Sequence, residues 1–276
     1  MHLPAFAAAA GGLFADHHLD VTFVDGQGRP ASVAAGGADF GLTAVLYLHQ
    51  ELAADRGLGV RFVGGLHRRH PIAALVREDS PVAQPGDLPG RTAADWSLRF
   101  MAPEYAAALG RLGLDRPRFV RLDDGADPSE AVRAGQVEVI PTWVDTLPVR
   151  TRHGVALRAV PVGGDICASG LVAADRVPEE VAGRMRDALA AGLVLQREDP
   201  RVGVVAFAER TGLPHDYVAQ GWALFEPCAG EGPSPLTMTA AEWERTVAST
   251  AAVHGLPVVD GEQVHRPAAT SPAPAL

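Results

Sequence analysis

The chain has 276 residues, of which 47% are hydrophobic and 21% are charged, the composition of a globular protein with one large domain or two lobes. Its formal net charge of −9 argues against a non-specific surface for nucleic acid or an anionic membrane. No stretch approaches the roughly 18 consecutive apolar residues of a membrane-spanning helix.

All 24 basic residues are arginine, because the sequence contains no lysine. A Schiff-base lysine is therefore absent, which excludes a self-supplied pyridoxal-phosphate or aldolase-type site. The two cysteines, Cys167 and Cys228, have no metal-ligand spacing, and we interpret each as a small buried hydrophobe. We expect no cofactor and no bound metal.

The first 18 residues are apolar but carry no basic segment, so they do not predict a signal peptide. As written, the chain is predicted to be cytoplasmic. A start site further upstream would instead make it a periplasmic or other extracytoplasmic protein.

The first part of the chain alternates between helical and strand patterns. An alternating, β-branched run predicts a strand at 19–24. Further along the chain, Thr43 is the expected N-cap of the helix at 44–55. The expected helices are 4–12, 30–35 and 44–55, and the expected strands are 19–24, 38–42, 60–64 and 72–76.

A second unit of strands and helices follows from about residue 80. Its expected strands are 91–94, 118–122, 137–140 and 155–160, and its expected helices are 98–112, 128–134 and 141–149. A strand at 166–173 and helices at 179–196, 200–210, 214–224 and 240–254 complete the chain. The Pro/Ala-rich tail, 263–276, is predicted to be disordered.

This alternation predicts a parallel α/β sheet. Ligands of such sheets bind at the carboxyl ends of the strands, beside helix N-termini. In this sequence those ends fall at 26–30, 42–44 and 66–70.

Six short motifs, in order, resemble the periplasmic binding proteins of the nitrate, sulfonate, taurine and thiamine-pyrimidine transport group. They cover most of residues 4–260, each being weak alone. The motifs are AGGLFADHHLDV (10–21), SVAAGGADFG (32–41), DSPVAQPGDLPGR (79–91), EYAAALGRLGL (104–114), AGQVEV (134–139) and SGLVAADRVP (169–178).

The resemblance implies a two-lobed, periplasmic-binding-protein-like α/β fold with two crossing hinge strands, near 75–80 and 164–172. Lobe 1 would comprise 1–77 and 170–262, and lobe 2 would comprise 78–165. Family members begin with a strand ahead of the first helix, so we expect lobe 1 to be one strand short. A ligand in the interlobe cleft would be enclosed by hinge closure.

The run His67, Arg68, Arg69 and His70 is the sharpest candidate for a ligand site. Its side chains could bind a carboxylate, sulfonate or phosphate by charge-assisted hydrogen bonds. The alternative is a solvated loop without a ligand, which contains arginine only because every basic residue of this chain is arginine.

The resemblance places further contacts from both lobes around a ligand. Trp96 and Trp143 are candidate stacking platforms for a flat heterocyclic ligand. The alternative is that each tryptophan is an ordinary packed apolar residue. Ser97 and Thr43 are candidate donors or helix caps, and Asp145 and Asp165 are candidate partners for an amino group or members of ion pairs. Two further candidates are His2, in a segment like the pyrimidine-binding branch, and Arg29.

Three functions remain open. The first is a monomeric solute-binding protein that feeds an ABC-transporter permease and holds an anionic or heteroaromatic ligand. The second is a cytoplasmic enzyme on the same fold, which also hosts decarboxylases, lyases, sulfinate desulfinases and a pyrimidine synthase. In such an enzyme His67 or His70 would move a proton and Arg69 would hold a carboxylate. The third is a ligand-sensing regulatory protein.

Overall fold

The computed structural model describes residues 2–26, 29–96, 100–151, 154–232 and 234–259. The chain divides into two compact units, which are treated separately. The larger unit contains His2–Arg69, Ile166–Ala219 and the chain from Cys228 onward, and the smaller unit contains His70–Asp165 and Gln220–Pro227. The predicted tail at 263–276 lies outside the described residues.

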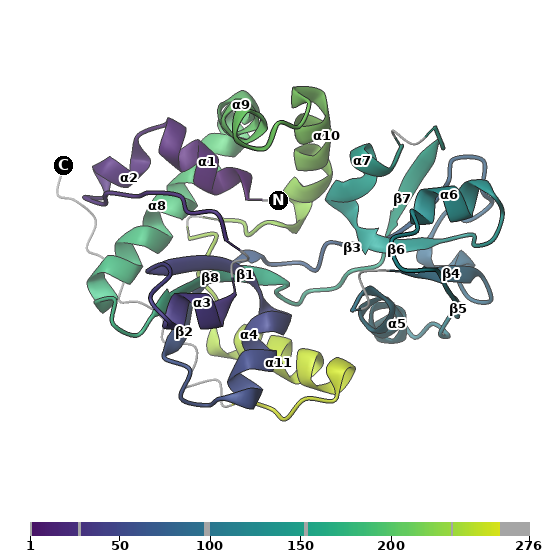
Figure 1. Cartoon of the computed structure of the whole chain (residues 1–276), viewed down its shortest axis with the longest axis horizontal. Coiled ribbons are helices and arrows are strands. Elements are labelled where there is room, and N and C mark those ends of the chain that lie inside the picture. Colours follow the sequence, from purple (N-terminus) through teal and green to yellow (C-terminus); the bar gives the residue numbers. More distant parts are fainter. Residues whose placement is uncertain (1, 27–28, 97–99, 152–153, 233, 260–276) are drawn as a thin grey trace. The chain divides into compact units, whose positions relative to one another are not determined.

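The larger unit is built on a three-stranded sheet with helices on both sides (Figure 1). Strand β8 lies in the middle, antiparallel to both β1 and β2. Its strands are β1 (Phe40–Ala44), β2 (Val60–His67) and β8 (Ser169–Ala174). Its helices are α1 (Leu3–Ala10), α2 (Leu13–Asp16), α3 (Pro30–Ala34), α4 (Val45–Ala54), α8 (Glu179–Glu198), α9 (Pro200–Thr211) and α11 (Ala240–His254).

Helices α3, α4 and α11 lie on one side of this sheet, and α1, α8 and α9 lie on the other (Figure 1). Local signals in the sequence set their ends. Helix α11 begins with a capping box, in which Thr239 and Glu242 satisfy each other's backbone N–H groups. It ends at Gly255, whose φ of 63° suits a residue without a side chain.

The smaller unit contains β3 (Ile72–Arg77) between β6 (Ile140–Trp143) and β7 (Leu157–Pro161), antiparallel to both. A second, two-stranded sheet consists of the parallel strands β4 (Thr92–Asp95) and β5 (Arg118–Arg121). An isolated bridge from Ala93 to Val139 links this sheet to the residue before β6. The other elements are η1 (Pro85–Asp87), α5 (Met101–Arg111), α6 (Pro128–Arg133), η2 (Val144–Thr146) and α7 (Leu147–Thr151). Helix α10 (His215–Phe225) runs from the larger unit into the smaller, followed by η3 (Glu226–Cys228).

Several predicted elements need correction. The predicted strand at 19–24 is extended but is not a strand in the described structure, because no strand lies beside it. Its aromatic residue, Phe23, packs instead against Phe6 and Phe14, with ring centroids 5.0 and 6.3 Å away. Thr43 is not a helix cap: it lies inside β1, and Ala44 is the N-cap of α4.

The predicted parallel sheet is also only partly right. The α/β class is confirmed, but β8 and β3 each run against both of their neighbours. Pro141 belongs to β6 rather than to a helix, and α7 begins only at Leu147. The unit boundary falls after Arg69 and not after residue 77, because β3 hydrogen-bonds to β6 and β7.

Both units have apolar interiors. In the larger unit the Phe62 ring stacks on Trp243 of α11, with centroids 4.5 Å apart. In the smaller unit α5 covers the sheet with Met101, Tyr105 and Leu109, all at most 1% exposed. Among the described helices, none is long and apolar enough to cross a membrane.

Tyr105 supplies a test of this packing. Its hydroxyl is buried with no hydrogen-bond partner in the described chain, and burial raises its pKa. Tyr105→Phe removes an unsatisfied polar group and should raise the free energy of unfolding by about 1 kcal/mol, measured by urea denaturation.

The matched control is Thr142→Val in β6. Its hydroxyl is also buried but lies 3.1 Å from the hydroxyl of Thr146, so its loss should lower stability. A loss of stability in Tyr105→Phe would mean that the tyrosine hydroxyl has a partner.

Candidate functional site

The predicted basic run is divided between the two units. His67 is the last residue of β2, Arg68 and Arg69 follow it in the larger unit, and His70 is the first residue of the smaller unit's main segment. The run thus supplies groups to two separate clusters, one at a strand end in each unit.

In the larger unit His67 is paired with Ser169, the first residue of β8. The two are opposite each other in the β2–β8 register, and the Ser169 hydroxyl contacts His67 Nδ1. Both are buried, at 4% and 6% exposure. Backbone bonds fix the pair, because Ala168 N–H donates to the His67 carbonyl at 3.0 Å.

Arg68 is an anchor within the larger unit. Its guanidinium forms an ion pair with Glu242 of α11 and donates to the Thr237 carbonyl at 2.5 Å. These contacts join the end of β2 to the start of α11. Arg69, in contrast, has an exposed side chain, and its backbone N–H donates to the Cys228 carbonyl at 3.0 Å.

Thr43 lies one residue before the N-cap of α4. It is 4% exposed, and its hydroxyl has no hydrogen-bond partner among the residues that the structure describes. A buried hydroxyl without a partner carries a desolvation cost. It stands where the first turn of a helix offers N–H groups without intrahelical acceptors.

The other two larger-unit candidates lie apart from this cluster in the sequence. Arg29 is tied to α4: its guanidinium is 3.5 Å from Glu51 Oε1 and lies over the Tyr47 ring, 4.2 Å from the centroid. His2 is the N-cap residue of α1, and burial lowers its pKa to about 3. The imidazole of His2 is therefore neutral at neutral pH.

In the smaller unit His70 makes a buried contact with Glu104. Its Nε2 lies 3.5 Å from Glu104 Oε2 of α5, and the two side chains are 8% and 10% exposed. Burial lowers the pKa of Arg111, against the opposing attraction of Glu104. Glu104 and Arg111 are seven residues apart, so they lie on the same side of α5.

The same cluster holds two segments of the chain closely together. His70 N–H donates to the Gly164 carbonyl at 3.0 Å. A Cβ atom at Gly163 would lie 1.7 Å from the His70 carbonyl oxygen, so only glycine fits this approach. The residue after this pair, Asp165, is exposed and ends the main segment of the smaller unit.

The tryptophans of the smaller unit differ in their surroundings. Trp96 is 5% exposed, its Nε1–H donates to the Pro141 carbonyl at 3.1 Å, and the Arg150 guanidinium lies 4.6 Å from its ring centroid. This geometry favours the packing interpretation of Trp96. Trp143 is partly buried, with its ring centroid 6.2 Å from that of Phe100.

The end of β6 brings Trp143 close to the His70 segment. Trp143 is opposite Ile72 in the sheet, and Val144 N–H donates to the Pro71 carbonyl at 2.8 Å. Asp145 follows in η2. Ser97 lies outside the described residues.

Sequence reasoning missed three of these groups, namely Ser169, Glu104 and Arg111. A signal existed for Glu104, since it falls three residues after Met101 and four before Ala108, within the apolar stripe of a helix. For Ser169 the signal was a lone hydroxyl in an otherwise apolar strand.

Cys167 does not have the properties of a nucleophile. It is 3% exposed, and burial raises its pKa to about 12, against an opposing effect of Arg68. A thiol needs a depressed pKa to react. The predicted role as a small buried residue fits this environment.

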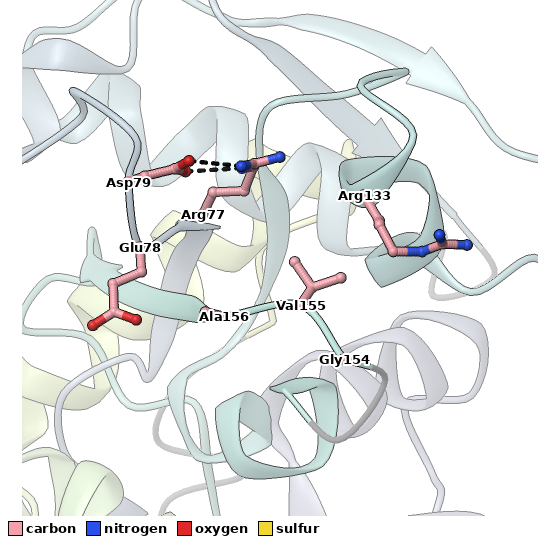
Figure 2. Close-up of a pocket in the computed structure, with 7 residues that line it drawn as sticks. All are labelled: Arg77, Glu78, Asp79, Arg133, Gly154, Val155 and Ala156. Carbon is pink, nitrogen blue, oxygen red and sulfur yellow. Dashed lines mark hydrogen bonds and ion pairs between the residues drawn. The ribbon is translucent and has the colours of Figure 1, made fainter.

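A separate surface depression of about 430 Å³ lies at the other end of β3. Figure 2 shows Arg77 turned toward Asp79, while Glu78 points away from that pair. Arg133 is paired with Glu130, and the side chains of Arg77, Asp79 and Arg133 are more than half exposed. These exposed, locally paired charges make the depression a weaker candidate than the strand-end clusters.

Arg68 should contribute more to stability than an exposed arginine of the same unit. Arg68→Ala removes the ion pair to Glu242 and the bonds to carbonyl groups, so the free energy of unfolding should fall by about 1–2 kcal/mol. Arg56→Ala is the matched control and should change it by less than about 0.5 kcal/mol, because Arg56 is exposed. Equal losses in urea denaturation would contradict the assignment of Arg68 as an anchor.

No group of three potential metal ligands occurs among the described histidine, cysteine, aspartate and glutamate residues. No curated protein matches the sequence. The family model described as NMT1/THI5 like matches residues 1–201, which is most of the chain.

Solved structures show the same fold at low sequence identity. The periplasmic aliphatic sulphonate binding protein SsuA from Escherichia coli has a TM-score of 0.75 at 18% identity, over 100% of this chain and 92% of that one. The alkanesulfonate-binding protein SsuA from Xanthomonas axonopodis pv. citri, bound to MOPS, has a TM-score of 0.64 at 18% identity, over 95% and 96%. A mutant of DSZB in complex with biphenyl-2-sulfinic acid has a TM-score of 0.60 at 14% identity, over 97% and 91%.

The matched family and these structures agree with the resemblance carried by the six sequence motifs. This chain has a periplasmic-binding-protein fold and belongs to the NMT1/THI5-like family.

Proposed function

We propose that the chain is a solute-binding protein for a small organic anion. The observation that carries this proposal is the buried hydroxyl of Thr43, which has no partner within the described residues. An oxygen of a bound ligand would accept its hydrogen and offset the desolvation cost of burying it. Because α4 begins two residues later, its dipole would favour a negative charge there.

Sulfonates are the first ligand class to test. Two proteins of the same fold are named for binding aliphatic sulphonates or alkanesulfonates, and one of them holds MOPS. A heteroaromatic ligand has less support, since the Trp96 ring already lies against Arg150 and its N–H is bonded. Trp143 remains the candidate stacking residue.

The proposed site draws on both units. Thr43, His67 and the exposed Arg69 would contribute from the larger unit, and Trp143, Asp145 and Asp165 from the smaller one. The ligand would lie in a cleft between the units, and contacts made only in the closed state would drive hinge closure. Arg68 and His70 would support this site through Glu242 and Glu104.

As a binding protein, the chain would work outside the cytoplasm and deliver its ligand to an ABC-transporter permease. This part of the proposal rests on the similar structures, several of which are described as periplasmic or as parts of ABC-type import systems.

An enzyme on this fold is the second candidate, and the buried contact between Ser169 and His67 favours it. A histidine oriented by a hydroxyl can move a proton during decarboxylation or desulfination. The test is incubation with aromatic sulfinates and carboxylates while sulfite and carbon dioxide are measured. Binding without turnover would exclude this candidate.

The binding proposal predicts opposite effects of one substitution on affinity and stability. Thr43→Val keeps the shape of the side chain but removes its hydroxyl. Affinity for an alkanesulfonate, measured by isothermal titration calorimetry, should fall about tenfold, the loss of one hydrogen bond of about 1.4 kcal/mol. Stability without ligand should rise by about 1 kcal/mol.

Thr246→Val is the matched control in the same unit. Its hydroxyl is also buried, but it accepts a bond from the Cys167 N–H at 3.1 Å. This variant should lose stability and keep its affinity. The proposal is wrong if the wild-type protein binds none of a series of alkanesulfonates, arylsulfonates and matched carboxylates.

A further inference from the structure

The outer edge of β1 has no strand beside it among the described residues. We propose that two copies of this chain associate through this edge, with β1 of one copy running antiparallel to β1 of the other. The two three-stranded sheets then form one continuous sheet across the dimer. This interface is independent of the ligand-binding function, and it departs from the monomer expected from the sequence.

The backbone bonds around β1 show which of its groups face outward. Ala174 N–H donates to the Asp39 carbonyl at 3.0 Å, and Val45 N–H donates to the Ala168 carbonyl at 2.9 Å. Successive residues of an antiparallel strand alternate between bonding to one neighbouring strand and facing away from it. Because the bonds at both ends of β1 fall on odd-numbered residues, its even-numbered residues face away from β8.

The outward-facing residues of β1 are Phe40, Leu42 and Ala44, and all three are half-buried. Their N–H groups have no hydrogen-bond partner among the described residues. The extended run at 19–24 forms no ladder with β1, and its aromatic ring packs against α1 and α2. The edge thus presents a row of backbone donors that another strand can satisfy.

The opposite edge of the same sheet is covered. Gly65 N–H of β2 donates to the Leu236 carbonyl at 2.8 Å, and His67 forms a bridge with Ala229. Proteins protect exposed edges from pairing with charged side chains, proline or a bulge. The sequence of β1, FGLTA, contains no charge and no proline, and its register has no shift, whereas β2 is irregular at two places. The edge of β1 therefore lacks the usual protection.

A second copy fits this edge because the edge is self-complementary. With a two-fold axis at Leu42, antiparallel pairing places Leu42 opposite itself and Phe40 opposite Ala44 of the second copy. All of these residues face outward, so each pair is of the hydrogen-bonded type. The two Leu42 residues exchange N–H and carbonyl bonds, and each Ala44 N–H donates to a Phe40 carbonyl. An interface that uses the same patch on both copies closes at the dimer.

The oligomeric state provides the first test, by sedimentation velocity from about 1 μM to about 1 mM protein. The wild type should change from monomer to dimer within this range. Leu42→Pro removes an outward N–H group and places a ring at the edge, without removing a bond to β8. This variant should stay monomeric, with its circular dichroism unchanged. Leu42→Val keeps the N–H group and, as the matched control, should dimerise like the wild type.

Amide hydrogen exchange of the wild type gives a readout that needs no variant. The N–H groups of Gly41 and Thr43 bond to β8 and should exchange slowly at every protein concentration. Those of Phe40, Leu42 and Ala44 should exchange rapidly in dilute protein and at least about tenfold more slowly once the dimer forms. If Leu42→Pro does not fold, this alternation decides the question.

A wild-type protein that remains monomeric over the whole range would overturn the proposal. So would a folded Leu42→Pro variant that still dimerises, or a dimer in which the outward N–H groups continue to exchange rapidly. Slow exchange of these groups in the monomer would also overturn it, because another part of the same chain would then cover the edge.

Discussion

The central position of β8 is the constraint on which the larger unit depends. The strand comes from residues 169–174, yet it lies between two strands that precede residue 68. Its place requires Gly170, where a Cβ atom would be 2.2 Å from the Gly64 carbonyl oxygen and 2.5 Å from the Phe62 ring. Because β8 fits only in this register, Ser169 meets His67 and Cys167 is enclosed near the end of β2.

The two strand-end clusters use polar groups in different ways. In the larger unit Ser169 contacts His67, and Arg68 pairs with Glu242. In the smaller unit His70 contacts Glu104 of α5, and both side chains are buried. A buried polar contact is costly to break because one partner is left without compensation. The first cluster joins the end of β2 to β8 and α11, and the second joins the start of β3 to α5.

Much of the fold could be predicted from the sequence, and the failures have physical causes. Periodicity located β1, α4, β2 and β3 to within a few residues, because their side-chain patterns are local. The run at 19–24 has the same strand pattern, but a strand needs a neighbour, and its pairing could not be known from the pattern. The direction of β8 was missed for the same reason, since it depends on residues more than 100 positions away.

The prediction of the site was limited in the same way. The sequence identified Thr43 and the run from His67 to His70 as important, but it could not assign them partners, because Arg68 meets Glu242 and His70 meets Glu104 only after folding.

The order of segments in the two units also has a consequence for synthesis on the ribosome. Most of the smaller unit is one continuous stretch, His70–Asp165, whereas the larger unit combines segments from the beginning, middle and end of the chain. Glu242, the partner of Arg68, is synthesised 174 residues after it. The central part of the chain can therefore fold while translation continues, whereas one face of the larger unit's sheet stays uncovered until α11 has been synthesised.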